Sequence, residues 1–230
     1  MSAGALELTG GHRPPAQVRK DRRASRSRAA PSAAHLHQVG PNAVIQLGHA
    51  LRAAGGDALA QQVFDAAGSA HWLSDPPSSM VDERAVARLF HATRAALPQT
   101  ADEVLAEAGR RTADYVAANR IPRLARLMLR VLPRGTAARA LAKAVERHGW
   151  TFCGSGTVTF ASTQRDRLIF AIEGNPIATP GCPWHVAVFE RLFRRFATRA
   201  ASVQHTTCCG RGARCCVIEI TLRPTGKAGA

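Results

Sequence analysis

The spacing of apolar residues changes near Trp150, and this change constrains the fold more than any other feature of the chain. Before Trp150, apolar residues recur every three or four positions, which is typical of helices that bury one face. After Trp150 come two short strand-like runs, one amphipathic helical segment and two more strand-like runs. This order of elements, helices followed by β-β-α-β-β, predicts an α+β fold with an antiparallel sheet.

Turn and cap residues divide the helical part, residues 39–149, into separate helices. Gly55 and Gly56 are expected to interrupt the first helical stretch. A later helix is expected to start at Asp82, and Thr100 can cap the helix after it, with Glu103 at the capping-box position. The predicted helices cover residues 43–53, 57–67, 82–97, 123–131 and 136–148, with one more beginning after Thr100.

The second part, residues 150–223, is expected to form one structural domain together with the first. Its helix should bury Phe189 and Phe193 on one side and leave Arg191 on the other. We expect strands at residues 157–162, 167–173, 201–207 and 215–222, and the helix at residues 184–197.

Both ends of the chain, residues 1–38 and 224–230, are predicted to be tails. The first contains seven Lys or Arg residues against two acidic residues and has little periodicity, which indicates disorder. Such a basic tail is suited to a weak contact with an anionic membrane. No apolar run approaches the roughly 20 residues of a membrane span, and the N-terminus lacks the apolar stretch of a secretory signal. We therefore expect a cytoplasmic protein.

The net charge of +15 raises the question of a nucleic-acid partner. Arginine is spread over the whole chain instead of forming one stripe, so we expect no specific nucleic-acid partner. The sequence leaves open whether the chain forms a homodimer.

Five of the six cysteines lie between residues 182 and 216. In a chain expected in the cytoplasm, such a cluster favours metal or thiol chemistry over disulfides. Zinc prefers four tetrahedral ligands drawn from Cys thiolate and His imidazole, and a catalytic zinc would need an open position. We therefore predict a closed, structural zinc site. Its expected ligands are Cys182, His205, Cys208 and Cys216.

Several alternatives to this ligand set stay open. Cys209 and Cys215 are each adjacent to an expected ligand, and His185 is a third rival. The cysteines could also be buried apolar residues that bind no metal. Cys182 and His185 could form a nucleophile and its base. An unusual iron–sulfur cluster is a further alternative, although the spacing fits none of the usual four-cysteine runs.

The chain contains two short glycine-rich turns, and a dinucleotide-binding motif would place such a turn between a strand and a helix. The sequence Gly154-Ser155-Gly156 lacks a third glycine and follows a helix. The second turn, from Gly210 to Gly212, leads into a strand. Neither turn predicts an NAD(P) site.

Four segments of the chain are distinctive when taken together. They are residues 39–44 (VGPNAV), 107–115 (EAGRRTADY), 150–156 (WTFCGSG) and 187–193 (AVFERLF). They resemble the 4-vinyl reductase family of bacteriochlorophyll biosynthesis, also described as divinyl-protochlorophyllide 8-vinyl reductases. The resemblance covers about residues 38–222, and the ending from Cys208 to Cys216 resembles the signature of the wider 4-vinyl-reductase domain.

The resemblance implies a fold similar to that of a vesicle-tethering complex subunit. It also implies a role in photosynthesis, namely reduction of the 8-vinyl (4-vinyl) group of a chlorophyllide-type tetrapyrrole, with a location at the periphery of the photosynthetic membrane. In sensor proteins that share the domain, three Cys and a Glu bind zinc. By position, Cys182, Cys208 and Cys216 match the cysteines, and His205 stands where the Glu is expected.

Two functions are consistent with the resemblance and the residues. Because no hydride-donor site is visible, the first is a substrate carrier or accessory subunit, with another bacteriochlorophyll biosynthesis enzyme supplying the electrons. Whether the chain is itself an oxidoreductase stays open. The alternative is a small-molecule sensor or scaffold with no enzymatic activity.

A bound pigment would need cations for its carboxylates and an apolar cavity, which we expect between the helices and the sheet. Arg111 shares a helix face with Tyr115 and is a candidate partner for a ligand carboxylate, with an acidic residue of the same helix as the alternative partner. His148 and Trp150, at the helix–strand junction, are candidate pocket residues, with core packing as the alternative.

Overall fold

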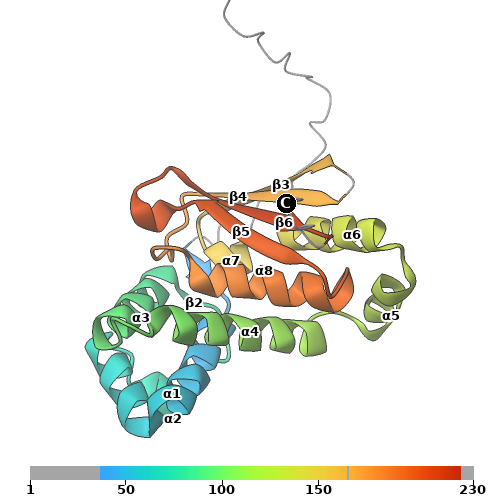
Figure 1. The fold of residues 1–230 in the computed structure, drawn as a ribbon. Helices are drawn as coiled ribbons and strands as arrows, with labels where there is room; N and C mark the ends of the chain where they lie inside the picture. Colours follow the sequence, from blue (N-terminus) through green and yellow to red (C-terminus); the bar gives the residue numbers. More distant parts are fainter. Residues whose placement is uncertain (1–36, 165, 224–230) are drawn as a thin grey trace, which may run out of the picture. The chain divides into compact units, whose positions relative to one another are not determined.

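The computed structural model describes residues 37–164 and 166–223, without the side chains of Trp150, Thr163 and Gln164 (Figure 1). Most of the two predicted tails, residues 1–36 and 224–230, lies outside the described residues. Within the described part, no helix is both long and apolar enough to cross a membrane.

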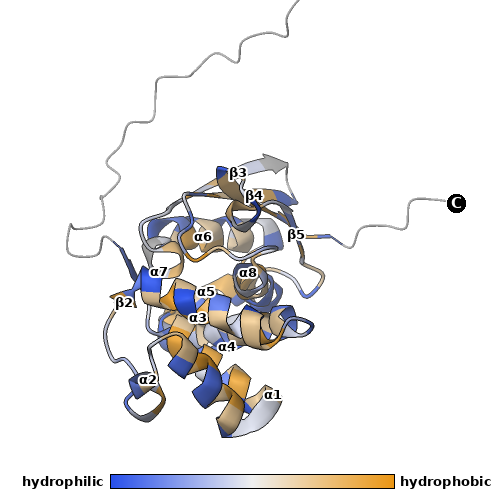
Figure 2. Cartoon of the chain, turned by 90° about the vertical axis from the view of Figure 1, so that its left-hand side faces the viewer, coloured by the Kyte–Doolittle hydropathy of each residue, from blue (hydrophilic) through white to orange (hydrophobic). Residues whose placement is uncertain are grey.

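Helix α1 (Asn42–Ala66) forms, with α3 (Glu83–Ala96) and α4 (Ala101–Asn119), a group of helices on the side of α8 (Pro183–Phe196) that faces away from the sheet (Figure 1). We call this group the helical layer. It bends at Gly55 and Gly56, whose φ angles of −154° and 74° lie outside the helical range, at the position where the sequence predicts a break. Figure 2 shows hydrophobic and hydrophilic residues alternating along α1, as expected of a helix with one buried face.

The two other helices of this layer begin differently. Helix α3 (Glu83–Ala96) begins directly after Asp82, where the sequence predicts a helix to start. The structure adds that the Asp82 side chain caps this helix by accepting a hydrogen bond from the Arg84 N–H. Helix α4 (Ala101–Asn119) begins after Thr100, whose side chain makes no capping hydrogen bond. The predicted capping box is therefore wrong.

Shorter elements connect this layer to the rest of the chain. Helices α5 (Arg123–Val131) and α6 (Arg134–Arg147) are separated by Leu132 and Pro133, because proline does not continue a helix. Four short elements were not predicted: α2 (His71–Ser74), α7 (Trp150–Cys153) and the paired strands β1 (Gln38–Val39) and β2 (Val81–Asp82).

The larger sheet has four antiparallel strands in the order β3-β4-β6-β5, so the last strand of the sequence lies in its interior. Along β6, buried and half-buried residues alternate, because successive side chains point to opposite faces. Helices α6 and α8 cover one face of this sheet (Figure 1). The elements are β3 (Thr157–Gln164), β4 (Arg167–Glu173), α8 (Pro183–Phe196), β5 (Ser202–Thr207) and β6 (Cys215–Thr221).

Helix α8 is the central element of the fold, because it packs against the sheet on one side and against α4 on the other (Figure 1). Toward the sheet, the ring of Phe189 stacks on Phe170 with centroids 4.9 Å apart. Toward α4, the approach is so close that a Cβ on Gly109 would lie 2.4 Å from the carbonyl oxygen of Trp184. Packing on both sides fixes α8, and with it the residues at its two ends.

The turn at Gly154 and Ser155, which the sequence analysis compared with a dinucleotide motif, wraps around a buried carboxylate. Glu83 is 4% exposed and accepts hydrogen bonds from the N–H of Ser155 at 2.7 Å and from its hydroxyl at 2.9 Å. Gly154 has a φ of 55°, and a Cβ there would overlap the Glu83 carboxylate. The glycine therefore allows the turn to close over Glu83.

Candidate metal centre and arginine-lined groove

Cys182, His205, Cys208 and Cys216, the four residues predicted as metal ligands, come together at one end of α8. Their ligand atoms all lie within 4.8 Å of one another. The Sγ atom of Cys182 lies 3.6 Å from that of Cys208 and 3.5 Å from that of Cys216, and the cysteines are free. A disulfide would require about 2 Å between sulfurs. Zinc–sulfur bonds of about 2.3 Å in a tetrahedron space two sulfurs by about 3.8 Å. The cluster could therefore hold a metal ion.

A strained turn brings Cys182 into this cluster. Gly181 has a φ of 80°, and Cys182 follows with φ 44° and ψ 49°, a left-handed conformation that residues with a Cβ rarely adopt. Pro183 then begins α8, a position that suits proline because the first N–H groups of a helix have no partner within it. Strain of this kind, of order 1–3 kcal/mol, is concentrated at functional sites.

A tight reversal between β5 and β6 supplies Cys208. A 3-10 turn over Cys209–Arg211 follows it, and Gly212, with a φ of 87°, returns the chain toward β6. A Cβ on Gly210 would lie 2.4 Å from the carbonyl carbon of Thr179, so only glycine allows this reversal to approach the loop before Cys182. The thiol of Cys208 donates to the carbonyl oxygen of Thr179 at 3.3 Å.

The electrostatics of the cluster favour a thiolate at Cys216. The hydrogen bond from the Cys182 thiol lowers the pKa of Cys216 to about 3, against the opposing effect of burial. The same hydrogen bond, together with burial, raises the pKa of Cys182. The backbone N–H of Cys209 also donates to the Cys216 sulfur, at 3.3 Å. A metal binds the thiolate form of cysteine, so one ligand is already in the binding form.

His205 completes the group with a ring nitrogen. Its Nε2 atom is buried and makes no hydrogen bond of good geometry within residues 37–164 and 166–223, although the ring helps to lower the pKa of Cys216. Buried polar groups without a partner are uncommon and call for an explanation. A metal ion shared with the three thiols would satisfy this nitrogen.

The three rival ligands lie around the cluster and not within the group of four. Cys215 precedes Cys216 in β6, so its side chain points to the opposite face of the sheet. The thiol of Cys209 is directed at the carbonyl oxygen of Ile172, 3.8 Å away.

His185 is also occupied elsewhere, because its Nε2 atom lies 3.0 Å from the carbonyl oxygen of Phe152. Burial lowers the pKa of this histidine to about 4, so it is neutral at pH 7. Within the described residues it makes no hydrogen bond to Cys182. The arrangement therefore does not support Cys182 and His185 as a nucleophile and base.

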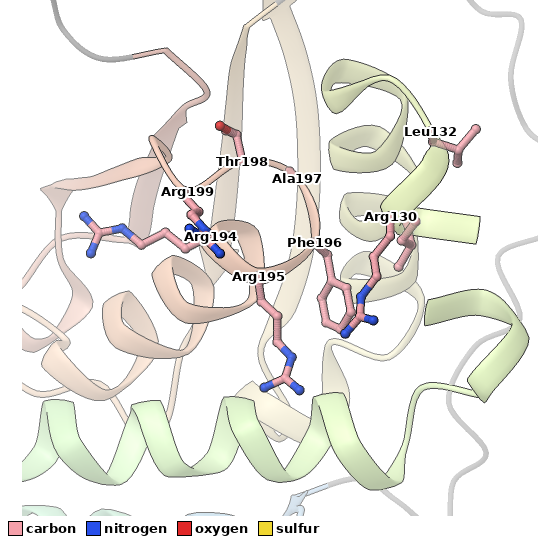
Figure 3. A pocket seen from close by; sticks show the side chains of 9 residues that line it. Arg130, Leu132, Arg194, Arg195, Phe196, Ala197, Thr198 and Arg199 are labelled. Atoms are coloured by element: carbon pink, nitrogen blue, oxygen red, sulfur yellow. The ribbon is translucent and has the colours of Figure 1, made fainter. Parts of the chain in front are cut away.

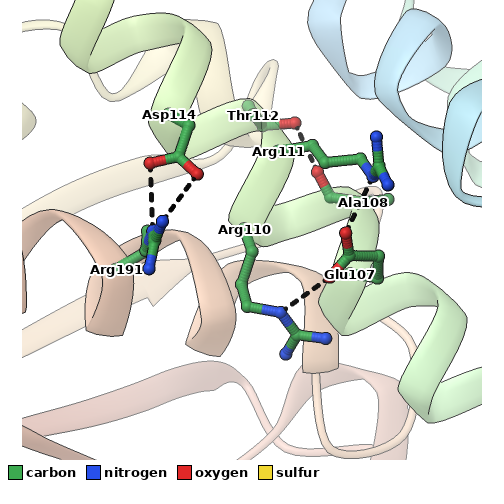
Figure 4. A network of polar contacts seen from close by, with 7 residues as sticks. All are labelled: Glu107, Ala108, Arg110, Arg111, Thr112, Asp114 and Arg191. Atoms are coloured by element: carbon green, nitrogen blue, oxygen red, sulfur yellow. Dashed lines mark hydrogen bonds and ion pairs between the residues drawn. The ribbon is translucent and has the colours of Figure 1, made fainter.

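The candidate pigment residues whose side chains are described lie on α4 and at the end of α6. Arg111 donates to Glu107, one turn earlier in α4, at 2.8 Å (Figure 4), so the alternative of a partner in its own helix is realised. Tyr115 is half-buried on the same helix, whereas His148 is exposed at the end of α6. The side chain of Trp150 lies outside the described residues.

Aromatic side chains pack in the space between α8 and the sheet, where the sequence predicts a cavity for the macrocycle. The ring of Phe170 lies 4.9 Å from that of Phe189, 6.0 Å from that of Phe193 and 5.9 Å from that of Phe160. This part of the expected cavity is a packed core.

A groove lies instead between α5 and the C-terminal end of α8 (Figure 3). Its volume is about 480 Å³. Arg195 reaches from the groove toward α4 (Figure 3), where Asp114 accepts its hydrogen bond at 3.1 Å. Asp114 also accepts hydrogen bonds from Arg191 (Figure 4). The lining residues are Leu129, Arg130, Leu132, Arg194, Arg195, Phe196, Ala197, Thr198 and Arg199.

Arg130 and Arg199 are the groove residues that the sequence analysis missed. Neither has an acidic partner among the residues that the structure describes, whereas Arg194 pairs with Glu190 and Arg195 with Asp114. A signal was present, because no Asp or Glu occurs between residues 115 and 145. Positive charge is therefore concentrated in residues 115–145, although the composition of the whole chain indicates an even distribution of arginine.

Comparison with known proteins gives two close sequence relatives, while no protein-family model matches the chain. The chain is 42% identical over 197 residues to the bacteriochlorophyll synthase 23 kDa chain of Cereibacter sphaeroides, covering 83% of this chain and 93% of that protein. It is 35% identical over 198 residues to the protein of the same name from Rhodobacter capsulatus, covering 84% of this chain and 90% of that protein.

Solved structures with a similar fold are H-NOX domains. An H-NOX mutant that carries 4-cyano-L-phenylalanine has a TM-score of 0.54 at 12% identity and covers 81% of this chain and 98% of its own. An H-NOX structure determined to probe heme distortion has a TM-score of 0.54 at 11% identity, and the match covers 84% of this chain and 100% of the H-NOX chain. These similarities concern the fold alone. The likeness to a vesicle-tethering subunit stays a prediction.

Proposed function

The chain belongs to the family of the bacteriochlorophyll synthase 23 kDa chain, and we propose that in bacteriochlorophyll biosynthesis it binds and presents a chlorophyllide-type tetrapyrrole. The observation that carries this proposal is the 42% identity over 83% of the chain. Its role is that of a carrier or accessory subunit for reduction of the 8-vinyl (4-vinyl) group. A separate reductase supplies the electrons.

The arginine-lined groove is the site that we assign to the pigment. Tetrapyrrole carboxylates need cations, and the guanidinium groups of Arg130 and Arg199 have no acidic partner among the described residues. Arginine can bind a carboxylate through two parallel hydrogen bonds. Leu129, Leu132 and Phe196 supply an apolar wall for the macrocycle. A groove of about 480 Å³ falls within the range of small-molecule sites.

The fold similarity agrees with this assignment in one respect. One of the similar H-NOX structures concerns heme distortion, and heme is a tetrapyrrole as chlorophyllide is. The fold is therefore compatible with a tetrapyrrole ligand.

Titration with divinyl-protochlorophyllide tests the proposal. The pigment's absorbance is expected to shift on binding, and an Arg130→Ala/Arg199→Ala variant is expected to bind at least tenfold more weakly, because a hydrogen bond to a charged group contributes about 1.5–3 kcal/mol. Arg147→Ala, which removes an exposed arginine at the other end of α6, should bind as the wild type does.

One result would contradict the proposed pigment binding, and another would contradict the proposed accessory role. If the wild-type protein leaves the pigment spectrum unchanged, the pigment-binding function is wrong and a sensor or scaffold role gains support. If the protein alone reduces the vinyl group when NADPH is added, it is a complete reductase and the accessory role is wrong.

We assign zinc to the metal centre and expect it to be structural. Three thiols and one imidazole are the donors that zinc prefers, and four protein ligands leave no open position for a substrate. One ion would join the start of α8 to the reversal between β5 and β6. The centre would thereby hold the fold together, and the groove at the other end of α8 would bind the pigment.

A further inference from the structure

Helix α5 exposes an apolar face that nothing in the described structure covers. Leu124 is 70% exposed, Leu127 59%, Met128 53% and Val131 76%, and these are the exposed large hydrophobic residues of the described chain. They follow the spacing i, i+3, i+4, i+7, so they lie on one side of the helix. The half-buried Ala125 and Leu129 lie on the other side, toward the protein. We refer to the four exposed residues as the α5 apolar face.

Positive charge surrounds this face, and among the described residues it is compensated only at Arg134, which pairs with Asp166 at 3.5 Å. The segment from residue 115 to residue 145 contains no Asp or Glu. Arg123 and Arg130 lie on α5 beside the apolar face, and no acidic partner for either is found among the described residues. Arg126 instead donates to the carbonyl oxygens of Ala117 and Ala118 at 3.1 and 2.8 Å, which ties α5 to the end of α4. The seven basic residues of the segment are Arg120, Arg123, Arg126, Arg130, Arg134, Arg139 and Lys143.

We propose that α5 docks the protein on an anionic lipid bilayer, with the α5 apolar face among the acyl chains and the neighbouring arginines at the headgroups. Helices that lie in the membrane interface combine an apolar face with Lys or Arg on the polar side, and attraction to anionic lipid adds to the burial of apolar area. In Figure 1, α5 lies at the edge of the described fold, beyond the sheet and the long helices, where a flat surface can reach it.

Charge decides between the bilayer and the other possible occupants. A second copy of the chain would bring two sets of uncompensated arginines together, which is unfavourable. The chain's own residues 1–36 contain seven Lys or Arg against two acidic residues, so they would add to the same repulsion. An anionic bilayer supplies apolar volume and negative charge in the same place. This inference does not depend on the proposed pigment binding.

Vesicle flotation with the full-length protein tests the proposal, with phosphatidylcholine vesicles compared with vesicles that also contain phosphatidylglycerol. The wild-type protein is expected to bind the anionic vesicles at least tenfold more tightly than the neutral ones. Leu124→Gln/Met128→Gln is expected to reduce binding to the anionic vesicles at least tenfold, because each buried CH₂ adds to membrane affinity. Arg123→Gln/Arg130→Gln should reduce it about tenfold and weaken its dependence on salt.

The control variant Arg147→Gln/Arg214→Gln removes the same charge from two exposed positions away from α5 and should bind nearly as the wild type does. Circular dichroism checks that each variant folds, which is expected because all the substituted side chains are exposed.

Three results would overturn the proposal. In the first, the wild type does not bind anionic vesicles. In the second, Leu124→Gln/Met128→Gln binds as the wild type does, which would assign the contact to the basic N-terminal segment. In the third, the wild type dimerises and the same substitution abolishes the dimer, which would make a second copy the occupant. No pigment is present in the assay, so none of these results bears on pigment binding.

Discussion

Replacing Cys216 with serine is expected to empty the metal centre and to lower the free energy of unfolding by about 4 kcal/mol, the size that accompanies loss of a bound metal. Cys216 is the cysteine whose pKa is lowered, to about 3, and it is fully buried between α8 and the reversal that follows β5. Metal binding is coupled to folding, so loss of a ligand weakens both. Elemental analysis should give about one zinc per chain for the wild type and much less for the variant, and urea denaturation measures the stability.

Cys215→Ser provides the matched control, because it makes the same chemical change one residue earlier in β6. The side chain of Cys215 points away from the cluster and is half-buried, so we expect full metal content and a stability change within about 1 kcal/mol. The ligand set is wrong if Cys216→Ser keeps its metal and its stability, or if the two variants behave alike.

Gly109→Ala is expected to destabilise the protein by about 2 kcal/mol, because a Cβ at this position overpacks the contact between α4 and α8. The new atom would lie 2.4 Å from the carbonyl oxygen of Trp184 and 3.0 Å from the Cβ of Ala187. The first of these is a backbone atom, so relief requires α8 to move as a whole. Because Cys182 immediately precedes α8, metal affinity should fall as well. Thermal and urea denaturation measure the first effect, and competition with a chelator measures the second.

Gly48→Ala should have the opposite effect on stability. Gly48 also lies within a helix, α1, but a Cβ there would meet the side chains of Leu73 and Phe64 at 3.6 Å, an ordinary contact distance. Alanine favours a helix over glycine by about 1 kcal/mol, so the variant should be slightly more stable. If both variants raise the stability, the close approach of α4 and α8 is wrong.

The sequence predicts best those features that depend on neighbouring residues. Gly55 and Gly56 mark a real bend in α1, and α3 begins directly after Asp82, where a helix start is predicted. The strand at residues 215–222 is identified by its alternation, and β6 covers Cys215–Thr221. The alternation also explains why Cys215 and Cys216 are not equivalent, since only one of these two neighbours can face α8.

Features that depend on tertiary packing could not be predicted in this way. The helical spacing that made Arg111 a candidate ligand also allows its ion pair with Glu107, and only the structure distinguishes the two. The groove is formed by Arg130 and Arg199, which are 69 residues apart and meet only when α5 folds against the end of α8. The interior position of β6 and the short elements β1 and α7 likewise depend on partners that are distant in the sequence.

Helix α8 links two sites that were described separately. Its first turn follows Cys182 and its last turn carries Arg194 and Arg195, and its 14 residues span about 20 Å at the rise of an α-helix. A rigid rod of this length transfers a displacement from one end to the other. In a chain without the proposed metal, a displaced α8 would therefore also shift Arg194 and Arg195 in the groove. If both proposals hold, pigment binding would then depend on whether the metal centre is filled.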